Sequence, residues 1–182
     1  MGEAGIAKAI AEARSYLSAN PAEARYRDGA ATASVEDGLR VRVAGADGAS
    51  LVTDMVTGIG GGGSAPSPGW MFRAAYASCI ATLIAMRAAE DGFSVRDLQV
   101  AVDSESDDQG ILGISADVPA GPLSMRVTVR AAAGDGDGAQ IRAAIEEAVA
   151  RCPVHDAVVR AVPVEVVPVS YTHLTLPTIL RV

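Results

Sequence analysis

The 182-residue sequence has few of the residues that mark nucleic-acid-binding, secreted or metal-binding proteins. It contains one lysine, two cysteines and two histidines, and its formal net charge is −7. An acidic chain without a basic run repels phosphate groups, which argues against nucleic acid and an anionic membrane surface as partners. The cysteines and histidines do not follow a zinc-ligand spacing, so we expect no metal site.

The sequence also lacks a secretory signal and a run long enough to span a membrane. Residues 1–6 do not combine a basic segment with an apolar stretch. We therefore expect a cytoplasmic protein whose two thiols stay reduced. The most apolar run, residues 74–86, is shorter than the roughly 20 residues of a membrane span, and it predicts a helix in the protein core instead.

Aromatic residues are scarce, at 4%, but the apolar share of 49% is enough for a sizeable core of aliphatic side chains. Helical and alternating patterns both occur, which predicts an α+β fold. We expect residues 1–20 to form an N-terminal helical extension and residues 21–169 to form the main domain. Residues 170–182 resemble translated adapter sequence, and we predict that they form a non-native or disordered tail.

Short alternating segments predict strands of antiparallel sheets. The first three are joined by turn sequences and should form a meander. The predicted strands cover residues 31–35, 39–43, 50–56, 98–102, 123–130 and 162–169. Pro163 and Pro168 place the last of them at a sheet edge, where it should close the domain.

Residues 68–90 predict one long helix. Ser67 suits the N-cap, Pro68 suits the first turn, and Gly92 suits the C-terminal stop. The helix is apolar around nearly its whole circumference, so we expect it to be buried on nearly all sides, with help from a partner subunit. Two further helices are predicted over residues 140–151 and 153–160.

Three loops resemble ligand sites only in composition. The glycine-rich residues 58–63 lack the lysine of a Walker loop and the glycine spacing of a dinucleotide fingerprint. The acidic residues 103–110 and 134–138 lack the ligand spacing of a calcium loop. We therefore expect all three segments to be connecting loops, and we expect the glycine-rich one to be flexible.

Cys79 falls in the middle of the long predicted helix, near Phe72, Tyr76, Leu83 and Met86 on its face. A free thiol has a pKa of about 8.5, and apolar burial raises it. The helix dipole gives no help in mid-helix. A reactive Cys79 therefore needs a cation from another element.

Cys152 stands directly before Pro153, at the start of the predicted short helix. Free N–H groups at a helix start stabilise a thiolate. His155 follows three positions later and is either a helping base or a surface histidine. The alternative for both cysteines is a purely structural role as small buried side chains.

The order of several segments resembles the OsmC/Ohr family, the osmotically induced and organic hydroperoxide resistance proteins. The segments are the glycine-rich stretch that ends in Ser-Pro at residues 60–68, Ala-Ser-Cys at 77–79, Cys-Pro-Val at 152–154 and the final Val-Pro-Val-Glu-Val at 162–166. The resemblance covers residues 26–169. It implies an intertwined homodimer, in which antiparallel sheets from both chains wrap two long central helices.

The resemblance further implies a thiol peroxidase that reduces organic hydroperoxides without a metal or organic cofactor. Cys79 would be the peroxidatic thiolate and Cys152 the resolving thiol, joined in a disulfide after oxidation. The activating arginine would be Arg27, before Asp28 and a glycine, with Arg25 as the alternative. A dithiol, such as a lipoylated protein, would reduce the disulfide.

One position departs from the family pattern. Active members often carry an acidic residue directly after the proline that opens the central helix, where it holds the arginine. Gly69 stands there in this chain. A second hypothesis therefore stays open: a non-catalytic member that binds an apolar small molecule at the dimer interface.

Overall fold

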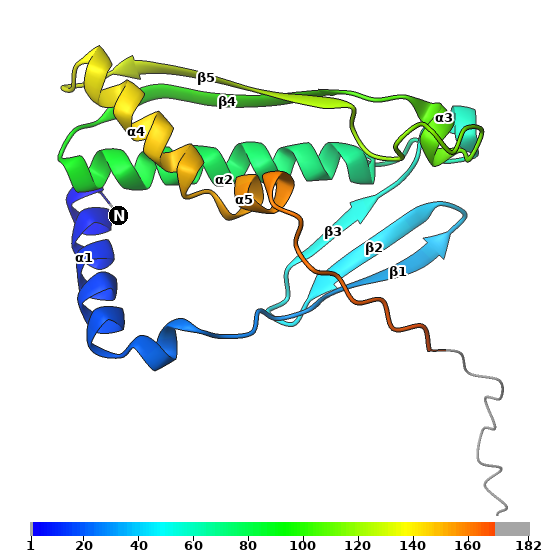
Figure 1. The fold of residues 1–182 in the computed structure, drawn as a ribbon, viewed down its shortest axis with the longest axis horizontal. Coiled ribbons are helices and arrows are strands. Elements are labelled where there is room, and N and C mark those ends of the chain that lie inside the picture. The colour runs from blue at the N-terminus through cyan, green and yellow to red at the C-terminus, as the bar shows by residue number, and fades with distance from the viewer. Residues whose placement is uncertain (1, 170–182) are drawn as a thin grey trace, which may run out of the picture.

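The long predicted helix is the central element of the computed structural model, which describes residues 2–169 (Figure 1). This helix, α2 (Pro68–Asp91), lies beneath an antiparallel sheet of two strands, β4 (Val95–Glu105) and β5 (Ser124–Ala133). The one-turn helix α3 (Asp108–Ile111) lies in the connection between them. Antiparallel sheets and helices occur together, which confirms the predicted α+β class.

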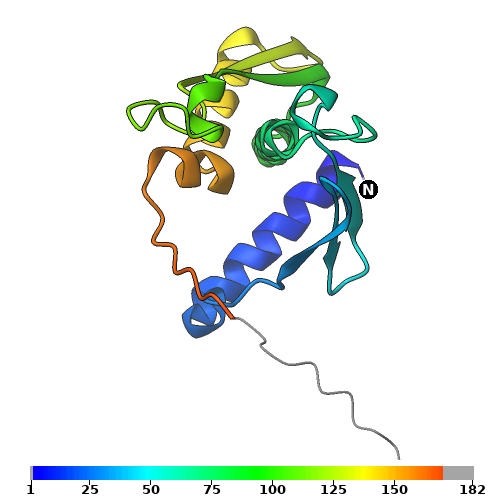
Figure 2. The ribbon, with the colours of Figure 1, turned by 90° about the vertical axis from the view of Figure 1, so that its right-hand side faces the viewer.

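Two more helices pack against α2 from the C-terminal part of the chain. Helix α4 (Gly138–Ala150) contacts both α2 and β5, and the short helix α5 (Pro153–Val159) contacts α2 and α4. Viewed along α2, the β4–β5 sheet, α4 and α5 all lie on one side of it (Figure 2). This side carries the main core of the chain.

Local sequence explains where α2 begins and ends. The Ser67 hydroxyl accepts a hydrogen bond from the Trp70 backbone N–H, and Pro68 occupies the first turn, where its missing N–H costs nothing. Gly92 ends the helix in the left-handed conformation, at φ 75°. The predicted range of 68–90 is therefore confirmed to within one residue.

Only one face of α2 is buried in the single chain. Its buried residues recur every four positions from Tyr76 through Ile80 and Ile84 to Ala88, with Ala89 next to the last. Burying a side chain such as Ile80 or Ile84, both 0% exposed, stabilises the fold by about 1.5–3 kcal/mol each. The opposite face, with Ala75, Ser78, Thr82 and Ala85, is exposed in the single chain, so the expected burial with help from a partner subunit stays a prediction.

Helix α2 is also long and apolar enough to cross a membrane by length and composition alone. Core helices of soluble proteins have the same two properties. The exposed face of α2 is in keeping with a helix that a second protein surface covers.

The predicted meander forms a separate antiparallel sheet of order β1-β2-β3. Its strands are β1 (Ala31–Asp37), β2 (Arg40–Gly45) and β3 (Ser50–Thr53). Gly38 and Gly48 sit in the two turns at φ 54° and 86°, a region that glycine enters without steric cost. Strand β1 is exposed along its whole length. This sheet therefore also presents a surface that no described part of the chain covers.

Helix α1 (Glu3–Ala19) stands at a steep angle to α2 and approaches one end of it (Figures 1 and 2). An ion pair joins Arg14 to Glu90 at the end of α2. None of the residues of α1 is buried. The short 3₁₀ helix η1 (Pro21–Ala24) then leads into the extended residues before β1.

The predicted closing strand over residues 162–169 is not formed. These residues are exposed and belong to neither of the two sheets. The chain leaves α5 in a direction away from the β4–β5 sheet (Figure 1). The alternating segment therefore lies next to no sheet edge of the described chain with which it could pair. Residues 170–182, the predicted tail, lie outside the described residues.

Asp54 organises the glycine-rich loop that follows β3. Its side chain is 2% exposed and accepts hydrogen bonds from the backbone N–H groups of Met55, Gly62 and Ser64 and from the Ser64 hydroxyl. These hydrogen bonds, those from Ser64 first, lower the pKa of Asp54 to about 2. The loop that the sequence predicts to be a flexible connection is therefore held by one carboxylate.

This carboxylate predicts a sensitivity to acid. Folding lowers its pKa, so its contribution to stability is complete above pH 3.8 and is lost as the pH falls toward about 2. Denaturant unfolding at a series of pH values should show the free energy of unfolding declining through this range. Asp54→Asn should flatten the decline, whereas Asp117→Asn, at an exposed site, should leave it unchanged. An unaltered decline in Asp54→Asn would contradict this assignment.

Candidate active site

The fold brings the two cysteines together from distant parts of the chain. The sulfur atoms of Cys79 and Cys152 lie 3.2 Å apart, and both thiols are free. Cys79 is on the α2 face that packs against α5, and Cys152 immediately precedes α5. A disulfide has an S–S length of about 2.05 Å, so only a small movement separates this arrangement from a covalent bond.

The start of α5 fixes the position of Cys152. Pro153 takes the first helical position, and Cys152 is the N-cap, whose sulfur accepts a hydrogen bond from the His155 backbone N–H at 3.4 Å. The Cys152 side chain is 0% exposed. The sequence prediction of a cysteine at a helix start is confirmed.

Burial governs the ionisation of Cys79. Burial raises the pKa of the Cys79 thiol, and the hydrogen bond with Cys152 raises it further, while the Val154 backbone N–H acts in the opposite direction. No lysine or arginine is among the groups that shift this pKa. Within the described chain, Cys79 therefore lacks the cation that a stable thiolate needs.

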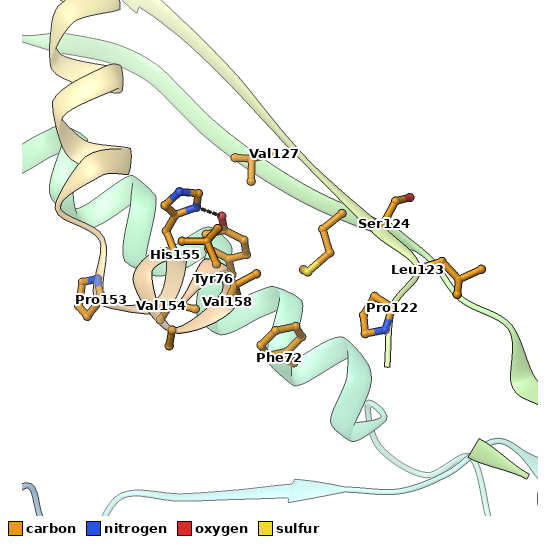
Figure 3. A pocket seen from close by; sticks show the side chains of 13 residues that line it. Phe72, Tyr76, Pro122, Leu123, Ser124, Val127, Pro153, Val154, His155 and Val158 are labelled. Carbon is orange, nitrogen blue, oxygen red and sulfur yellow. Dashed lines mark hydrogen bonds between the residues drawn. The ribbon is translucent and has the colours of Figure 1, made fainter. Parts of the chain in front are cut away.

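A tyrosine and a histidine, each three positions from one of the two cysteines, meet at the wall of a cavity (Figure 3). The Tyr76 hydroxyl shares a short hydrogen bond with Nδ1 of His155, and the two rings lie 6.0 Å apart between centroids. Tyr76 is 3% exposed and precedes Cys79 by almost one helical turn. The sequence left two roles open for His155, a helping base or a surface histidine. Its hydrogen bond with Tyr76 argues against an isolated surface histidine.

The pairing of Tyr76 with His155 is a feature that sequence reasoning missed. The helical pattern predicts only that Tyr76 neighbours Cys79 on one helix face. Its spacing of three positions from Cys79 matches the spacing between Cys152 and His155. The shared spacing could have indicated a contact between Tyr76 and His155. It does so only once α5 is known to pack against α2, which the sequence does not show.

A cavity of 740 Å³ opens beside this pair. Its lining comes from α2, β5 and its preceding loop, and α5, and most of it is apolar: Phe72, Tyr76, Pro122, Leu123, Ser124, Met125, Val127, Pro153, Val154, His155, Ala157, Val158 and Val159. Cavities of this size hold small organic ligands. Val154 belongs to this wall and also donates its N–H to Cys79, so the cavity borders the thiol pair.

The structure does not bring Arg27 to the thiols of its own chain. Arg27 and Arg25 are exposed and lie in the extended segment between η1 and β1, well separated from the middle of α2 (Figure 1). The third candidate site residue is thus apart from Cys79 and Cys152 in one chain. Any contact with Cys79 requires a second subunit.

Gly69 lies in the first turn of α2, where the family often has an acidic residue. A Cβ at this position would meet only the side chains of Arg73 and Ser67, at 3.9 Å, which is ordinary contact. A larger side chain would therefore fit at position 69 without a steric clash at its Cβ. Arg73 itself is hydrogen-bonded to the Ser104 hydroxyl across the chain.

Within residues 2–169 there is no group of three or more histidine, cysteine, aspartate or glutamate side chains that could hold a metal ion. The reactive side chains that the structure brings together at this site are the two thiols and the Tyr76–His155 pair. A long central helix with one thiol, facing a second thiol at a neighbouring helix start, defines a dithiol protein of the α+β class.

The chain belongs to the OsmC family, since the family model described as OsmC-like protein matches residues 61–167. This confirms the resemblance found in the sequence. A search of curated proteins finds no significant match.

Solved structures with the same fold include an OsmC-like protein from Mycoplasma pneumoniae, with a TM-score of 0.63 and 12% identity, covering 75% of this chain and 91% of that one. An organic hydroperoxide resistance protein from Legionella pneumophila has a TM-score of 0.54 and 22% identity, covering 74% and 90%. One from Elizabethkingia anophelis has a TM-score of 0.54 and 18% identity, covering 73% and 89%. At these identities the likeness concerns the fold.

Proposed function

We propose that this protein is a thiol peroxidase that reduces organic hydroperoxides through Cys79 and Cys152. The observation that carries the proposal is the 3.2 Å separation of the two sulfur atoms. Two thiols at this distance can form a disulfide after either one is oxidised. Family membership and the names of the two hydroperoxide resistance proteins with this fold support a role in peroxide resistance.

The reaction begins when the Cys79 thiolate attacks the distal oxygen of R–O–O–H. The O–O bond breaks, Cys79 becomes a sulfenic acid, and the alcohol leaves after taking a proton. The Cys152 thiol then displaces the sulfenic hydroxyl as water, and the two sulfur atoms are joined. The predominantly apolar cavity favours peroxides with an organic group over hydrogen peroxide.

The proposal includes a homodimer. The exposed face of α2 and the fully exposed strand β1 both leave surface that a second subunit can cover. Arg27 belongs to the segment between η1 and β1, which lies away from the middle of α2 in its own chain, so an activating role requires that it approach Cys79 of the second subunit. An adjacent guanidinium would lower the thiol pKa that burial raises.

The cycle is completed by an external dithiol, such as a lipoylated protein, which reduces the disulfide by thiol–disulfide exchange. We place the protein in the cytoplasm, where such reductants keep free cysteines reduced. No metal or organic cofactor takes part.

Titration with cumene hydroperoxide tests the proposal. One equivalent should consume both free thiols of each chain and leave an intramolecular disulfide between Cys79 and Cys152. Thiol counting before and after the addition, with mass spectrometry of unreduced peptides, gives the measurement. Excess dithiol should restore both thiols and allow repeated turnover. Thiols that survive many equivalents of peroxide would overturn the peroxidase function.

Two observations support a second candidate function, the non-catalytic binding of a small molecule. The pKa of Cys79 is raised in the single chain, and Gly69 supplies no carboxylate to hold an arginine. A non-catalytic protein that binds an apolar small molecule in the 740 Å³ cavity agrees with both. This function predicts inert thiols and ligand binding that survives replacement of both cysteines by alanine.

A further inference from the structure

The hydrogen bond between Tyr76 and His155 joins two elements at the wall of the cavity. Tyr76 comes from α2 and His155 from the first turn of α5, and both side chains line the cavity (Figure 3). The bond joins two polar groups in largely apolar surroundings. Cys79 is three positions beyond Tyr76, and Cys152 is three positions before His155. The pair is therefore tied to both thiols through the two helices that carry them.

The proposed peroxidase reaction has a chemical need at this place. Breaking the O–O bond of an alkyl hydroperoxide leaves an alkoxide, which is a strong base and a poor leaving group unless a proton reaches it. Tyr76, His155 and Ser124 are the residues with polar side chains among those that line the cavity. Ser124 is at hydrogen-bond distance from the Glu105 carboxylate. Tyr76 and His155 are the remaining proton donors.

We propose that Tyr76 protonates the departing alkoxide and that His155 returns the proton to Tyr76. This inference rests on the proposed peroxidase function. When an N–H at Nδ1 of His155 donates to the Tyr76 oxygen, the tyrosine O–H is left free to point at the substrate. Tyr76 is thus a catalytic acid, and His155 is the residue that positions and recharges it.

The protons and electrons balance in this scheme. The Cys79 thiolate and R–O–O–H give the sulfenic acid and RO⁻, because the electron pair of the O–O bond leaves with the alkoxide. RO⁻ takes the Tyr76 proton and leaves as the alcohol. Tyr76 takes the Nδ1 proton of His155, and His155, which is only partly buried, regains a proton from solvent.

The surroundings of Tyr76 suit an acid that must keep its proton until the reaction. Burial, followed by the nearby charge of Cys152, raises the pKa of Tyr76, so the hydroxyl stays protonated at neutral pH. On α5, Asp156 is next to His155 and is paired with Arg160. On α4, Glu147 is paired with Arg151. Asp156 interacts first with Arg160 and also, more weakly, with the charge of His155.

The leaving group provides the experiment. Tyr76→Phe keeps the ring and removes only the hydroxyl. Its rate constant for oxidation by cumene hydroperoxide, which leaves an alkoxide, should fall by about 100-fold. Its rate constant for a peroxycarboxylic acid such as peracetic acid, which leaves a stable carboxylate that needs no proton, should stay within about twofold of the wild type. Rapid mixing followed by thiol quenching and mass spectrometry measures both rates.

Two further variants complete the test. Tyr16→Phe removes a hydroxyl that bonds to Glu23 on α1 and η1, away from the site, and should change neither rate. His155→Phe should repeat the selective loss for cumene hydroperoxide, by about tenfold or more. A loss in Tyr76→Phe that is equal for both oxidants would assign Tyr76 a structural role and overturn the inference, as would no loss at all. Wild-type thiols that resist both oxidants would overturn the proposed function, and the inference with it.

Discussion

Replacing Cys79 by serine is expected to lower the rate of organic hydroperoxide reduction by about 1,000-fold or more, because a serine hydroxyl does not ionise near neutral pH and forms no sulfenic acid. The remaining Cys152 is fully buried, with 0% of its surface exposed, so it should not replace Cys79 as the nucleophile. Loss of cumene hydroperoxide in the presence of dithiothreitol measures the effect.

Cys152→Ala is the matched variant for this experiment. It leaves the nucleophile in place, so one equivalent of peroxide should still react and convert Cys79 to sulfenic acid. Without its neighbour at 3.2 Å, that sulfenic acid has no thiol to condense with, and excess peroxide should carry it to sulfinic and sulfonic acid. A Cys152→Ala protein whose Cys79 stays unmodified, beside an active Cys79→Ser protein, would make Cys152 the nucleophile instead.

Arg27→Ala is expected to raise the pKa of Cys79 and slow its oxidation, by about tenfold for each pKa unit. The structure adds a sharper expectation, because Arg27 lies apart from Cys79 in its own chain. If the guanidinium serves the partner subunit, each site of the dimer contains residues from two chains. An Arg27→Ala chain and a Cys79→Ser chain would then each be defective alone and complementary together.

Co-expression of the two variants under different affinity tags isolates the mixed dimer. One of its two sites combines an intact Cys79 with an intact Arg27 from the other chain, so the mixed dimer should recover about half of the wild-type rate. Arg25→Ala is the control, since it occupies the same exposed segment two positions away. A rate indifferent to Arg27, a mixed dimer as slow as its parents, or equal dependence on Arg25 would each count against the assignment.

Much of the local structure could be predicted because its causes are local. Ser67 and Gly92 determine where α2 begins and ends. Pro153 starts α5 and thereby makes Cys152 an N-cap. The glycine turns of the meander likewise depend on a few neighbouring residues. These features were readable from short stretches of sequence.

The site itself depends on packing between distant segments and was only partly predictable. Resemblance to a family paired Cys79 with Cys152, but the physics of each cysteine alone did not place them 3.2 Å apart. The bond between Tyr76 and His155 has the same origin, since it exists only because α5 packs on α2.

Alternation in residues 162–169 predicted a strand that the single chain does not form. The pattern reports a preference for extended backbone, and it contains no information about which edge, in which subunit, would receive it. Burial of α2 shows the same limit. The pattern predicts a helix that is apolar on nearly all sides, whereas the described chain buries one face of it.

The two thiols also lie at the ends of a very long stretch of chain, 73 positions from one to the other, which contains the second half of α2, both strands of its sheet and α4. Joining them closes a covalent ring around most of the core. In the chain-entropy description, a ring of this size reduces the conformational entropy of the unfolded chain and so raises the free energy of unfolding by about 4 kcal/mol. In each turnover the molecule would therefore change from the reduced to the disulfide-bonded form and back. The disulfide-bonded form would be the more stable of the two and the more resistant to proteases.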